Sequence, residues 1–363
     1  MSDVLVVTLP LGANYGGILQ AYALQTVVGR FGLTAHVTGS GGALPLRMVR
    51  TIPGSGYVID ALLERRISRS VAIRRRTHSF IRQHIRTVNF NVAEANSKCH
   101  RYQKYLVGSD QVWRPEYTHV PHNLLSFAPS GATRISYAAS FGVDTLEGLD
   151  DSLANQCRTL AGQFDAISVR EASGVRLCCA EWGVGAEQHL DPTMLLDAQA
   201  YINLFTLHSD SLTHVPIELL AYVLDPSPDS RALIDVASTT SGLTPRELLP
   251  AAGAAASNPV PTVYEWLRSF RSAAYVVTDS FHGVVFSIIF NKPFLVAANS
   301  ARGSTRFDSL LGVFGLEDRL ISGADDITPE RMSAPIDWDR VNARMTQERQ
   351  RAQSYLRRHL ASA

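Results

Sequence analysis

The sequence lacks the features of secreted, membrane-spanning and disulfide-rich proteins. Its 363 residues include four cysteines and no Cys-x-x-Cys pair, which favours reduced thiols over a disulfide framework or a zinc site. No apolar run approaches the roughly 20 residues that a membrane-spanning helix needs. The first residues, MSDVLVV, place no basic segment before their short apolar run, so we predict no signal peptide. These absences favour a cytoplasmic protein.

An excess of charge of one sign is also lacking. The chain has 34 basic and 33 acidic residues and a net charge of +1, which gives no electrostatic reason to expect nucleic acid as a partner. What is present is the composition of a folded protein, with 45% apolar and 18% charged residues. Chains of this composition and length usually form two domains, each with its own core.

One local exception to the charge balance lies between Arg65 and Arg86, where eight arginines occur with no acidic residue after Glu64. The simplest interpretation is the solvated face of a helix. The sharper one is a peripheral surface for an anionic acceptor, or for a membrane that carries a lipid-linked acceptor. Nucleic acid is disfavoured here too, because Phe80 is the only Phe, Tyr or Trp among the arginines and single-strand binding relies on such rings.

Short β-branched runs alternate with helical patterns along the chain, which is typical of parallel sheets. We expect strands at residues 4–9, 105–107, 135–138, 166–169, 189–190, 218–223, 274–278 and 294–296. We expect helices at residues 17–31, 62–86, 170–182, 230–239, 263–271 and 283–290. The economical fold class is α/β with two Rossmann-like lobes.

The predicted domains are an N-terminal lobe at residues 1–195, a C-terminal lobe at residues 196–335 and a terminal helix at residues 336–363. An acidic pair, Asp337 and Asp339, indicates the start of that helix,. Such a helix can cross back and brace the first lobe.

The turn after the first strand is rich in glycine but lacks the dinucleotide-binding fingerprint, because the glycine spacing differs. Glycine allows close approach of backbone N–H groups to a ligand, and a helix N-terminus favours an anion or a sugar oxygen. The candidate binding residues of this turn are Asn14, Tyr15, Gly16, Gly17 and Gln20. A plain strand-to-helix turn is the alternative.

Two other strand ends carry candidate residues. Ser109 and Asp110 follow the strand at residues 105–107, at the carboxyl edge where open α/β sheets bind ligands. Asp110 would accept a hydrogen bond or a proton from a sugar hydroxyl, unless it only closes an Asx turn. Arg170 follows the strand at residues 166–169 and offers a planar fork for a carboxylate or a phosphate. A structural ion pair with a neighbouring carboxylate is the equal alternative for Arg170.

The most informative segment is the one that carries His282. A strand ends in Thr-Asp-Ser, and the chain turns through Phe281, His282 and a glycine into an apolar helix. Asp279 or Ser280 can cap this helix, whose free N–H groups suit an anion. A lone histidine is usually structural, but one between a helix cap and a glycine is a better candidate for function.

A last candidate site follows the strand at residues 294–296. Arg302 and Arg306 flank the hydroxyl-rich Gly-Ser-Thr sequence before another helix. Paired cations beside hydroxyls and backbone donors can form an anion site. The alternative is a solvated loop whose arginines contact the helix or the other lobe.

Six segments, taken together and in this order, resemble the polysaccharide pyruvyl transferase family. They are NYGGILQAYALQ from Asn14, VGSDQVW from Val107, SYAASFG from Ser136, SVRE from Ser168, DPTMLL from Asp191 and TDSFHG from Thr278. The resemblance covers about residues 3–315. It implies a fold like that of the two-lobed GT-B glycosyltransferases, with the acceptor side in the first lobe and the donor side in the second.

The resemblance also implies an activity, the transfer of pyruvate from phosphoenolpyruvate onto a sugar of a glycan or glycolipid as a cyclic ketal. Such enzymes act in polysaccharide biosynthesis for the cell envelope, and a lipid-linked acceptor would place this one at the inner face of the membrane. Arg170, His282 and the Phe281 backbone match family positions around phosphoenolpyruvate. Arg302 falls where the family often has a cation, and we extend that role to Arg306.

The expected roles follow from the donor and acceptor chemistry. His282 would bind the phosphate or transfer a proton, and Arg170 and Arg302 would bind the donor anions. Asp110 and Asn14 would face the acceptor. Neither a cofactor nor a metal is expected, since phosphoenolpyruvate is itself the donor substrate.

Two other classes of function stay open. A nucleotide-sugar-dependent GT-B glycosyltransferase would need an acidic residue for the ribose and contacts for a base, and no such set is evident in residues 196–335. A non-catalytic carbohydrate-binding protein would keep the fold and bind an acceptor without consuming phosphoenolpyruvate.

Overall fold

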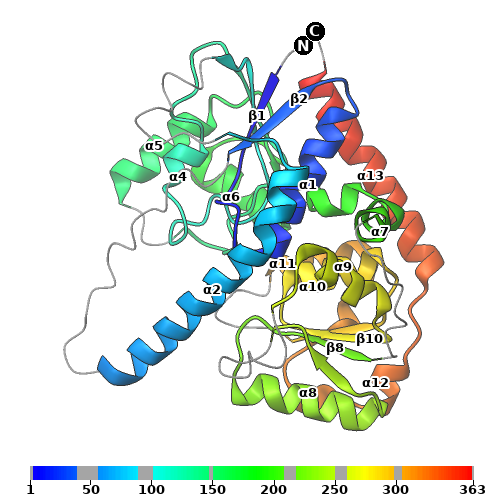
Figure 1. Ribbon diagram of the computed structural model, residues 1–363. Coiled ribbons are helices and arrows are strands. Elements are labelled where there is room, and N and C mark those ends of the chain that lie inside the picture. The colour runs from blue at the N-terminus through cyan, green and yellow to red at the C-terminus, as the bar shows by residue number, and fades with distance from the viewer. Residues whose placement is uncertain are drawn as a thin grey trace.

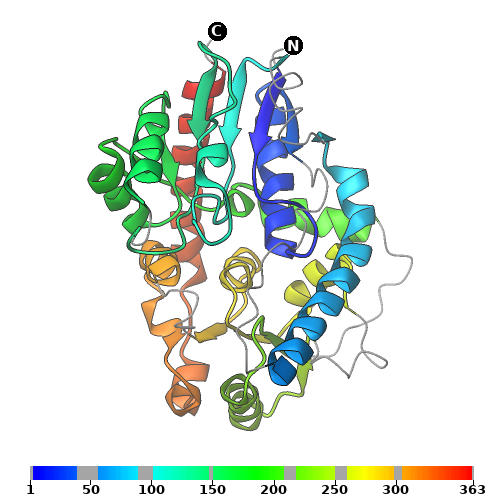
Figure 2. The same ribbon diagram turned by 90° about the vertical axis from the view of Figure 1, so that its left-hand side faces the viewer.

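The computed structural model describes residues 3–38, 56–88, 101–146, 150–207, 218–249, 260–297 and 305–361, with only the main chain for residues 56–69. The described chain forms two α/β lobes, each built on a parallel sheet (Figure 1). A long C-terminal helix runs along one side of both lobes (Figure 2). The first strand begins and this last helix ends at the same end of the first lobe.

The first lobe is built on five parallel strands in the order β3-β2-β1-β4-β5. They are β1 (Asp3–Val7), β2 (Thr34–Thr38), β3 (Thr87–Val88), β4 (Lys104–Val107) and β5 (Thr133–Ser136). Isolated bridges from Ile135 to Ala166 and from Ala139 to Val169 continue the sheet to a short parallel pair, β6 (Ser168–Val169) and β7 (Glu187–Gln188). Four of the five residues of β1 are buried, as expected of a strand covered on both faces.

The helices of this lobe include one, α1 (Tyr15–Gly29), that is buried on nearly all sides. They are α1, α2 (Gly56–His84), α4 (Val120–Asn123), α5 (Asp151–Ala161) and α6 (Ala172–Trp182), followed by the 3₁₀ helix η2 (Pro192–Leu195) and by α7 (Ala198–Thr206). Twelve of the fifteen residues of α1 are buried. Its largely apolar sequence therefore fits a central position between the sheet and η2,.

The second lobe has the strand order β12-β11-β10-β8-β9. Its strands are β8 (Leu219–Tyr222), β9 (Pro245–Glu247), β10 (Tyr275–Thr278), β11 (Phe294–Ala297) and β12 (Leu320–Ile321). Its helices are α8 (Pro228–Ser241), α9 (Val263–Ser272), α10 (Phe281–Ile289), α11 (Thr305–Phe314) and α12 (Pro329–Ser333), with 3₁₀ turns η4 (Glu317–Arg319) and η5 (Ala324–Asp326). Every residue of β10 and α10 is buried, so this strand and helix form the core of the lobe.

The C-terminal helix α13 (Trp338–Leu360) braces the first lobe. Asp337 caps its N-terminus by accepting the backbone N–H of Arg340 at 3.0 Å. Arg349 donates to the carbonyls of Met194 and Leu196 at 2.6 and 2.8 Å. These contacts tie the end of the chain to η2.

The division of the chain at residues 195 and 335 stays a prediction, because the elements near the first boundary contact both lobes. Tyr201 in α7 donates its hydroxyl to the Thr193 carbonyl at 2.8 Å and packs edge-on against Phe286 of α10, with ring centroids 5.0 Å apart. The connection between the lobes is therefore packed against both of them.

The basic helix α2 extends from the first lobe along the second (Figures 1 and 2). Thr77 ties it to the first lobe by donating to the Gly12 carbonyl at 2.7 Å, and Arg76 ties it to Glu265 of α9 at 2.9 Å. Arg74, Arg75 and Arg82 are exposed. No helix within the described residues is both long and apolar enough to cross a membrane.

The described strands and helices match most of the predicted ones, with two local corrections. The strand predicted at residues 189–190 is wrong, since β7 is Glu187–Gln188. The helix predicted from residue 170 begins at Ala172, because Glu171 has an extended backbone (φ −115°, ψ 150°). Arg170 therefore stands at a strand end, ahead of the helix.

Candidate active site at the junction of the lobes

The predicted site residues lie where the strand order of each sheet reverses direction. In the first sheet this point falls between β1 and β4, and in the second it falls between β8 and β10. Open α/β sheets bind ligands in the crevice outside the carboxyl ends of such strands. The turns after β1 and β4 carry Asn14 and Asp110, and the turn after β10 carries His282.

Asp110 and Asn14 form the first-lobe side of the site. Asp110 is 4% exposed and has a left-handed backbone with a φ of 76°. Its Oδ1 accepts the Gln111 N–H at 2.9 Å, and its Oδ2 accepts from Asn14 Nδ2 at 2.9 Å. A Cβ on Gly17 would come within 3.3 Å of Asp110 Oδ2. The left-handed backbone is uncommon for a residue other than glycine and turns this carboxylate toward the start of α1.

At the centre of the site lies Asp191, which is fully buried. Its Oδ2 accepts from Arg170 Nη1 at 3.0 Å and from Ser109 Oγ at 3.2 Å, and it lies 3.5 Å from His282 Nε2. Its Oδ1 accepts from the backbone N–H of Thr193 at 3.0 Å and from Thr193 Oγ at 2.7 Å. One carboxylate therefore contacts two candidate donor-binding side chains.

His282 belongs to the second lobe but packs against the first. It follows Ser280, the N-cap of α10, whose Oγ accepts the Gly283 N–H at 3.4 Å. A Cβ added to Gly16 would lie 2.0 to 2.5 Å from three atoms of the His282 ring. The imidazole therefore packs directly on the Gly16 backbone, and only glycine leaves room for it.

The capping alternative between Asp279 and Ser280 is resolved in favour of Ser280. Asp279 instead accepts the backbone N–H groups of Leu224 and Asp225 at 2.7 and 3.2 Å. These bonds hold the ends of β10 and β8 together, so Asp279 supports the edge of the sheet.

Arginine side chains cover the ring of Phe281. The Arg170 guanidinium carbon lies 4.2 Å from the ring centroid and that of Arg306 lies 5.9 Å from it. Arg170 is paired with Asp191, as the structural alternative requires. Its Nε and Nη2 are nevertheless buried without a hydrogen-bond partner among the described residues, although Nε lies 3.9 Å from Glu171 Oε2 in a second, longer ion pair. The two ion pairs leave Nη2 as a donor for a ligand.

The charged side chains clustered around Asp191 keep its carboxylate ionised. Burial raises the pKa of this carboxyl group, but the charges of His282 and Arg170 and the hydrogen bonds of the site outweigh burial and hold the pKa well below its usual range,. Burial, with the neighbouring charge of Arg170, lowers the pKa of Arg306 to about 10. Arg306 and the Asp191 carboxylate are therefore charged at neutral pH.

The remaining predicted residues are divided between the cluster and its surroundings. Ser109 is in the cluster through its bond to Asp191. Tyr15 stacks on Trp266 with centroids 5.7 Å apart and donates to the Pro261 carbonyl at 2.5 Å, so its side chain packs against the second lobe. Gln20 is buried and donates to Thr8 Oγ1 at 2.8 Å, which supports the turn after β1. Arg302 lies outside the described residues.

Two acidic residues of the site were not among the predicted ones. Asp191 follows β7 in the DPT sequence, and its place after a strand was the available signal. Glu171 is fully buried, and its Oε1 accepts from Ser140 Oγ, Phe141 N and Gly142 N at 2.9, 2.8 and 3.2 Å. Glu171 therefore holds the loop after β5 against the start of α6.

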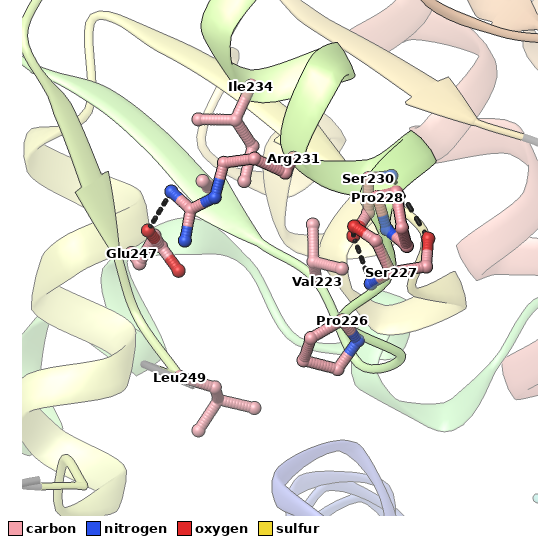
Figure 3. Close-up of a pocket in the computed structure, with 10 residues that line it drawn as sticks. Val223, Pro226, Ser227, Pro228, Ser230, Arg231, Ile234, Glu247 and Leu249 are labelled. Atoms are coloured by element: carbon pink, nitrogen blue, oxygen red, sulfur yellow. Dashed lines mark hydrogen bonds and ion pairs between the residues drawn. The ribbon is translucent and has the colours of Figure 1, made fainter. Parts of the chain in front are cut away.

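Two cavities lie near the sheets. One of about 120 Å³ adjoins the site and is lined by Arg170, Asp191 and Phe281 together with residues of α11 and α13. The other, of about 280 Å³, lies at the carboxyl ends of β8 and β9 (Figure 3). Arg231 and Glu247 pair across it at 2.6 Å, and Ser227 and Ser230 cap α8 reciprocally. Within the described residues no group of three His, Cys, Asp or Glu is placed to hold a metal ion.

Solved structures define the class of fold. A putative UDP-N-acetylglucosamine 2-epimerase from Listeria monocytogenes has a TM-score of 0.56 at 9% identity, covering 99% of this chain and 97% of that chain. UDP-N-acetylglucosamine 2-epimerase from Rickettsia bellii has a TM-score of 0.52 at 11% identity, covering 99% of both chains. Identities this low show the fold alone. The protein has a two-lobed GT-B-type fold with its candidate site between the lobes.

Sequence comparison defines the family within that class. No curated protein matches the chain. Residues 14–301 match the model of the polysaccharide pyruvyl transferase family. This match covers well over half of the 363 residues, so the chain belongs to the polysaccharide pyruvyl transferase family and is a transferase.

Proposed function

We propose that this enzyme transfers pyruvate from phosphoenolpyruvate to a sugar of a glycan or glycolipid, forming a cyclic ketal and releasing phosphate. The observation that carries the proposal is Arg170, whose side chain is 2% exposed and whose Nε and Nη2 have no hydrogen-bond partner in the described chain. Buried donors without partners are strongly unfavourable, so they usually serve a ligand. An anionic donor would satisfy them.

The surroundings of Arg170 support a donor with two anionic groups. Phosphoenolpyruvate carries a carboxylate and a phosphate, each suited to an arginine fork or to a helix N-terminus. The Arg306 guanidinium carbon lies 5.9 Å from the centroid of the Phe281 ring, and His282 lies in the first turn of α10. Arg302, where the family often has a cation, binds the same donor, and we extend that role to Arg306.

The reaction needs proton transfer in both directions. Protonation of the methylene carbon makes C2 electrophilic, and a sugar hydroxyl then adds to C2 and loses its proton. The C2–O bond to phosphate breaks with its electron pair, and a second hydroxyl adds to the resulting oxocarbenium to close the ketal. The two hydroxyl protons balance the new methyl hydrogen and the proton on the released phosphate.

We assign these steps to residues on both sides of the junction. His282 binds the phosphate or transfers the proton, and Arg170 binds the donor anions. Asp110, with Asn14 bonded to its Oδ2, faces the acceptor hydroxyls and receives a proton. The left-handed backbone of Asp110 supports such a role, because strained backbone often occurs at functional sites.

The alternative is a nucleotide-sugar-dependent glycosyltransferase on the same fold. One similar structure, with a TM-score of 0.50 at 10% identity over 99% of this chain and 97% of that chain, is described as Staphylococcus aureus MnaA with UDP. That ligand belongs to that protein. A thermal-shift comparison distinguishes the two functions, because phosphoenolpyruvate should raise the Tm, whereas stabilisation by UDP or GDP alone would overturn our proposal.

The direct test is release of phosphate from phosphoenolpyruvate in the presence of a panel of glycosides and lipid-linked sugars. We expect release with at least one acceptor. Arg170→Lys should raise the KM for phosphoenolpyruvate by about tenfold or more, because an ammonium cannot make the bidentate contacts of a guanidinium. Arg176→Lys, an exposed change in the same segment, is the matched control. Equal KM values for both variants would remove Arg170 from the donor site.

We also propose that the enzyme works in the cytoplasm, with α2 in peripheral contact with the inner face of the membrane. The exposed Arg75 and Arg82 support this proposal, since clustered basic residues bind anionic lipid headgroups. The protein should sediment with phosphatidylglycerol vesicles but not with phosphatidylcholine vesicles. Changing Arg75 and Arg82 to Glu should abolish sedimentation, whereas the same change at the exposed Arg357 and Arg358 should not. Equal sedimentation of both variants would refute the contact.

A further inference from the structure

Asp191 is the charged group at the centre of the site that has no role in the proposed reaction. Its carboxylate is fully buried and caps η2. Thr193 fixes Oδ1 through two hydrogen bonds, at 2.7 and 3.0 Å. With Oδ1 held in place, Oδ2 is directed at Arg170 Nη1 and His282 Nε2, which lie 3.0 and 3.5 Å away. The orientation of this carboxylate is therefore determined before any substrate arrives.

His282 is confined on two sides by the first lobe. Its Nε2 is buried and faces Asp191, at the outer limit of a hydrogen bond. Its ring packs on the Gly16 backbone, where a Cβ would overlap the imidazole. Contacts of this kind often shorten when a substrate binds. With Nε2 turned toward Asp191, Nδ1 is the remaining ring nitrogen, and it lies at the Gly16 backbone.

We propose that Asp191 is the positioning residue of this active site. It holds His282 with Nε2 toward itself, so that Nδ1 is the nitrogen that meets the donor, and it balances the charges of Arg170 and His282 until the anionic donor binds. This inference rests on the pyruvyl transfer proposed above. Because Asp191 belongs to the first lobe and His282 to the second, the contact also makes the reactive histidine depend on the docked arrangement of the lobes.

The charges around the histidine support this choice. The other charged groups of the cluster are Asp110 after β4, Glu171 before α6 and Arg306 on α11. Asp110 is bonded to Asn14, and Glu171 holds the loop after β5. Among the described residues, Asp191 alone contacts both Arg170 and His282. A carboxylate that fixes the orientation and tautomer of a histidine in this way is a recurrent device of acid–base catalysis.

The proposal is tested with Asp191→Asn, which keeps the cap of η2 and the shape of the side chain but removes the charge. We expect kcat for phosphate release, measured per folded molecule, to fall on the order of 10²-fold or more. The KM for phosphoenolpyruvate should stay the same or fall, because the site becomes more positive. Asp197→Asn is the matched control, since Asp197 is an exposed helix cap six positions further along and asparagine caps as well as aspartate.

A second measurement follows the imidazole itself. In ¹⁵N NMR of labelled protein, with the His282 signals identified by their loss in His282→Gln, wild type should show the proton on Nε2 when the ring is neutral. In Asp191→Asn a larger share of the neutral ring should carry its proton on Nδ1, because an amide holds the Nε2 proton less strongly than a carboxylate does. Asp197→Asn should leave the tautomer unchanged. A neutral wild-type ring with the proton on Nδ1, or the same tautomer ratio in Asp191→Asn as in wild type, would overturn the proposal.

The outcomes separate this inference from the function on which it rests. If wild type releases no phosphate from phosphoenolpyruvate with any acceptor, the proposed reaction fails. The NMR measurement of the His282 tautomer still decides the role of Asp191. If Asp191→Asn does not fold, Thr193→Val removes the hydroxyl hydrogen bond to Oδ1, keeps the backbone one and leaves the charge. We then expect a smaller fall in kcat, about tenfold, with little change in KM. A kcat within twofold of wild type in a folded variant would refute a positioning role.

Discussion

The two cavities described above present their ion pairs in opposite ways. Next to the junction of the lobes, the side chains of Arg170 and Asp191 are 2% and 0% exposed, and the guanidinium retains donors without partners. In the second-lobe cavity, the side chains of Arg231 and Glu247 are 52% and 29% exposed (Figure 3). The second cavity is the larger one, at about 280 Å³ against about 120 Å³.

This difference indicates that buried charge marks the functional region better than cavity volume does. An exposed ion pair contributes about 0–1 kcal/mol, because water solvates each partner almost as well. A buried arginine with open donors is unfavourable until a ligand satisfies it. Charged groups that remain crowded and incompletely bonded in a folded protein therefore indicate function. The predictions below test this contrast between the two regions.

The largest effect is expected for His282→Ala. Loss of a group that transfers a proton or binds the leaving phosphate should lower kcat for phosphate release by about 10²- to 10⁴-fold. The side chain packs on Gly16 and lies 3.5 Å from Asp191, but α10 keeps its cap at Ser280 without it, so the far-UV circular dichroism spectrum should stay that of wild type. Near-native turnover in a folded variant would remove His282 from the mechanism.

A comparable loss is expected for Gly16→Ala, because the new Cβ would lie 2.0 Å from His282 Nδ1. The ring must shift, and misplacement of a catalytic group by about 1 Å can lower the rate by about 10²-fold. Gly29→Ala is the matched control, since Gly29 ends the same helix and a Cβ there meets no atom within 4 Å. Phosphate-release rates that are equal in the two variants would contradict the close packing of Gly16 on His282.

Much of the fold could be predicted from the sequence because its central elements carry strong apolar patterns. β10 and α10 are buried throughout, and their apolar runs end at turn residues. β2 (Thr34–Thr38) was missed, since it alternates partly buried polar residues with only two buried ones, Ala35 and Val37. A strand of that composition gains its stability from β1 and β3 on either side of it, which local patterns do not reveal.

The site was predictable where a residue follows a strand, as Arg170 and His282 do. Asp191 also follows a strand, but its importance depends on the packing of the two lobes, which brings it within 3.5 Å of His282. The packing of Tyr15 on Trp266 depends on the same docking. Distances between lobes are set by many weak contacts over the whole chain, so no local motif encodes them.

Low pH should reduce the stability that the buried charge of Asp191 gives to the fold. The pKa of Asp191 in the folded protein is well below its ordinary value of 3.8, so its charge stabilises the fold above about pH 4. This contribution is lost as the pH falls from there through the lower folded-state pKa, and it is on the order of 2–3 kcal/mol.

Urea unfolding of wild type and Asp191→Asn at pH 7 and pH 3 measures the contribution of this charge to stability. The difference in the free energy of unfolding between the two proteins should shrink at pH 3, because Asp191 of the unfolded wild type takes up a proton there and asparagine does not. The other carboxyl groups titrate in both proteins, so their effects cancel. A difference that stays constant over this range would show that Asp191 is not stabilised as an anion.

The smallest effect is expected in the larger cavity, for Arg231→Ala. The substitution breaks the exposed pair with Glu247 and should change the free energy of unfolding by less than about 1 kcal/mol. Because the pair lies at the ends of β8 and β9 and His282 is not among the residues that line this cavity, kcat and the KM for phosphoenolpyruvate should stay within about twofold of wild type. Urea unfolding and the phosphate-release assay measure both quantities on one preparation. A loss of turnover as large as that of His282→Ala would place the reaction in this cavity, and exposure of an ion pair would then be no guide to where the chemistry occurs.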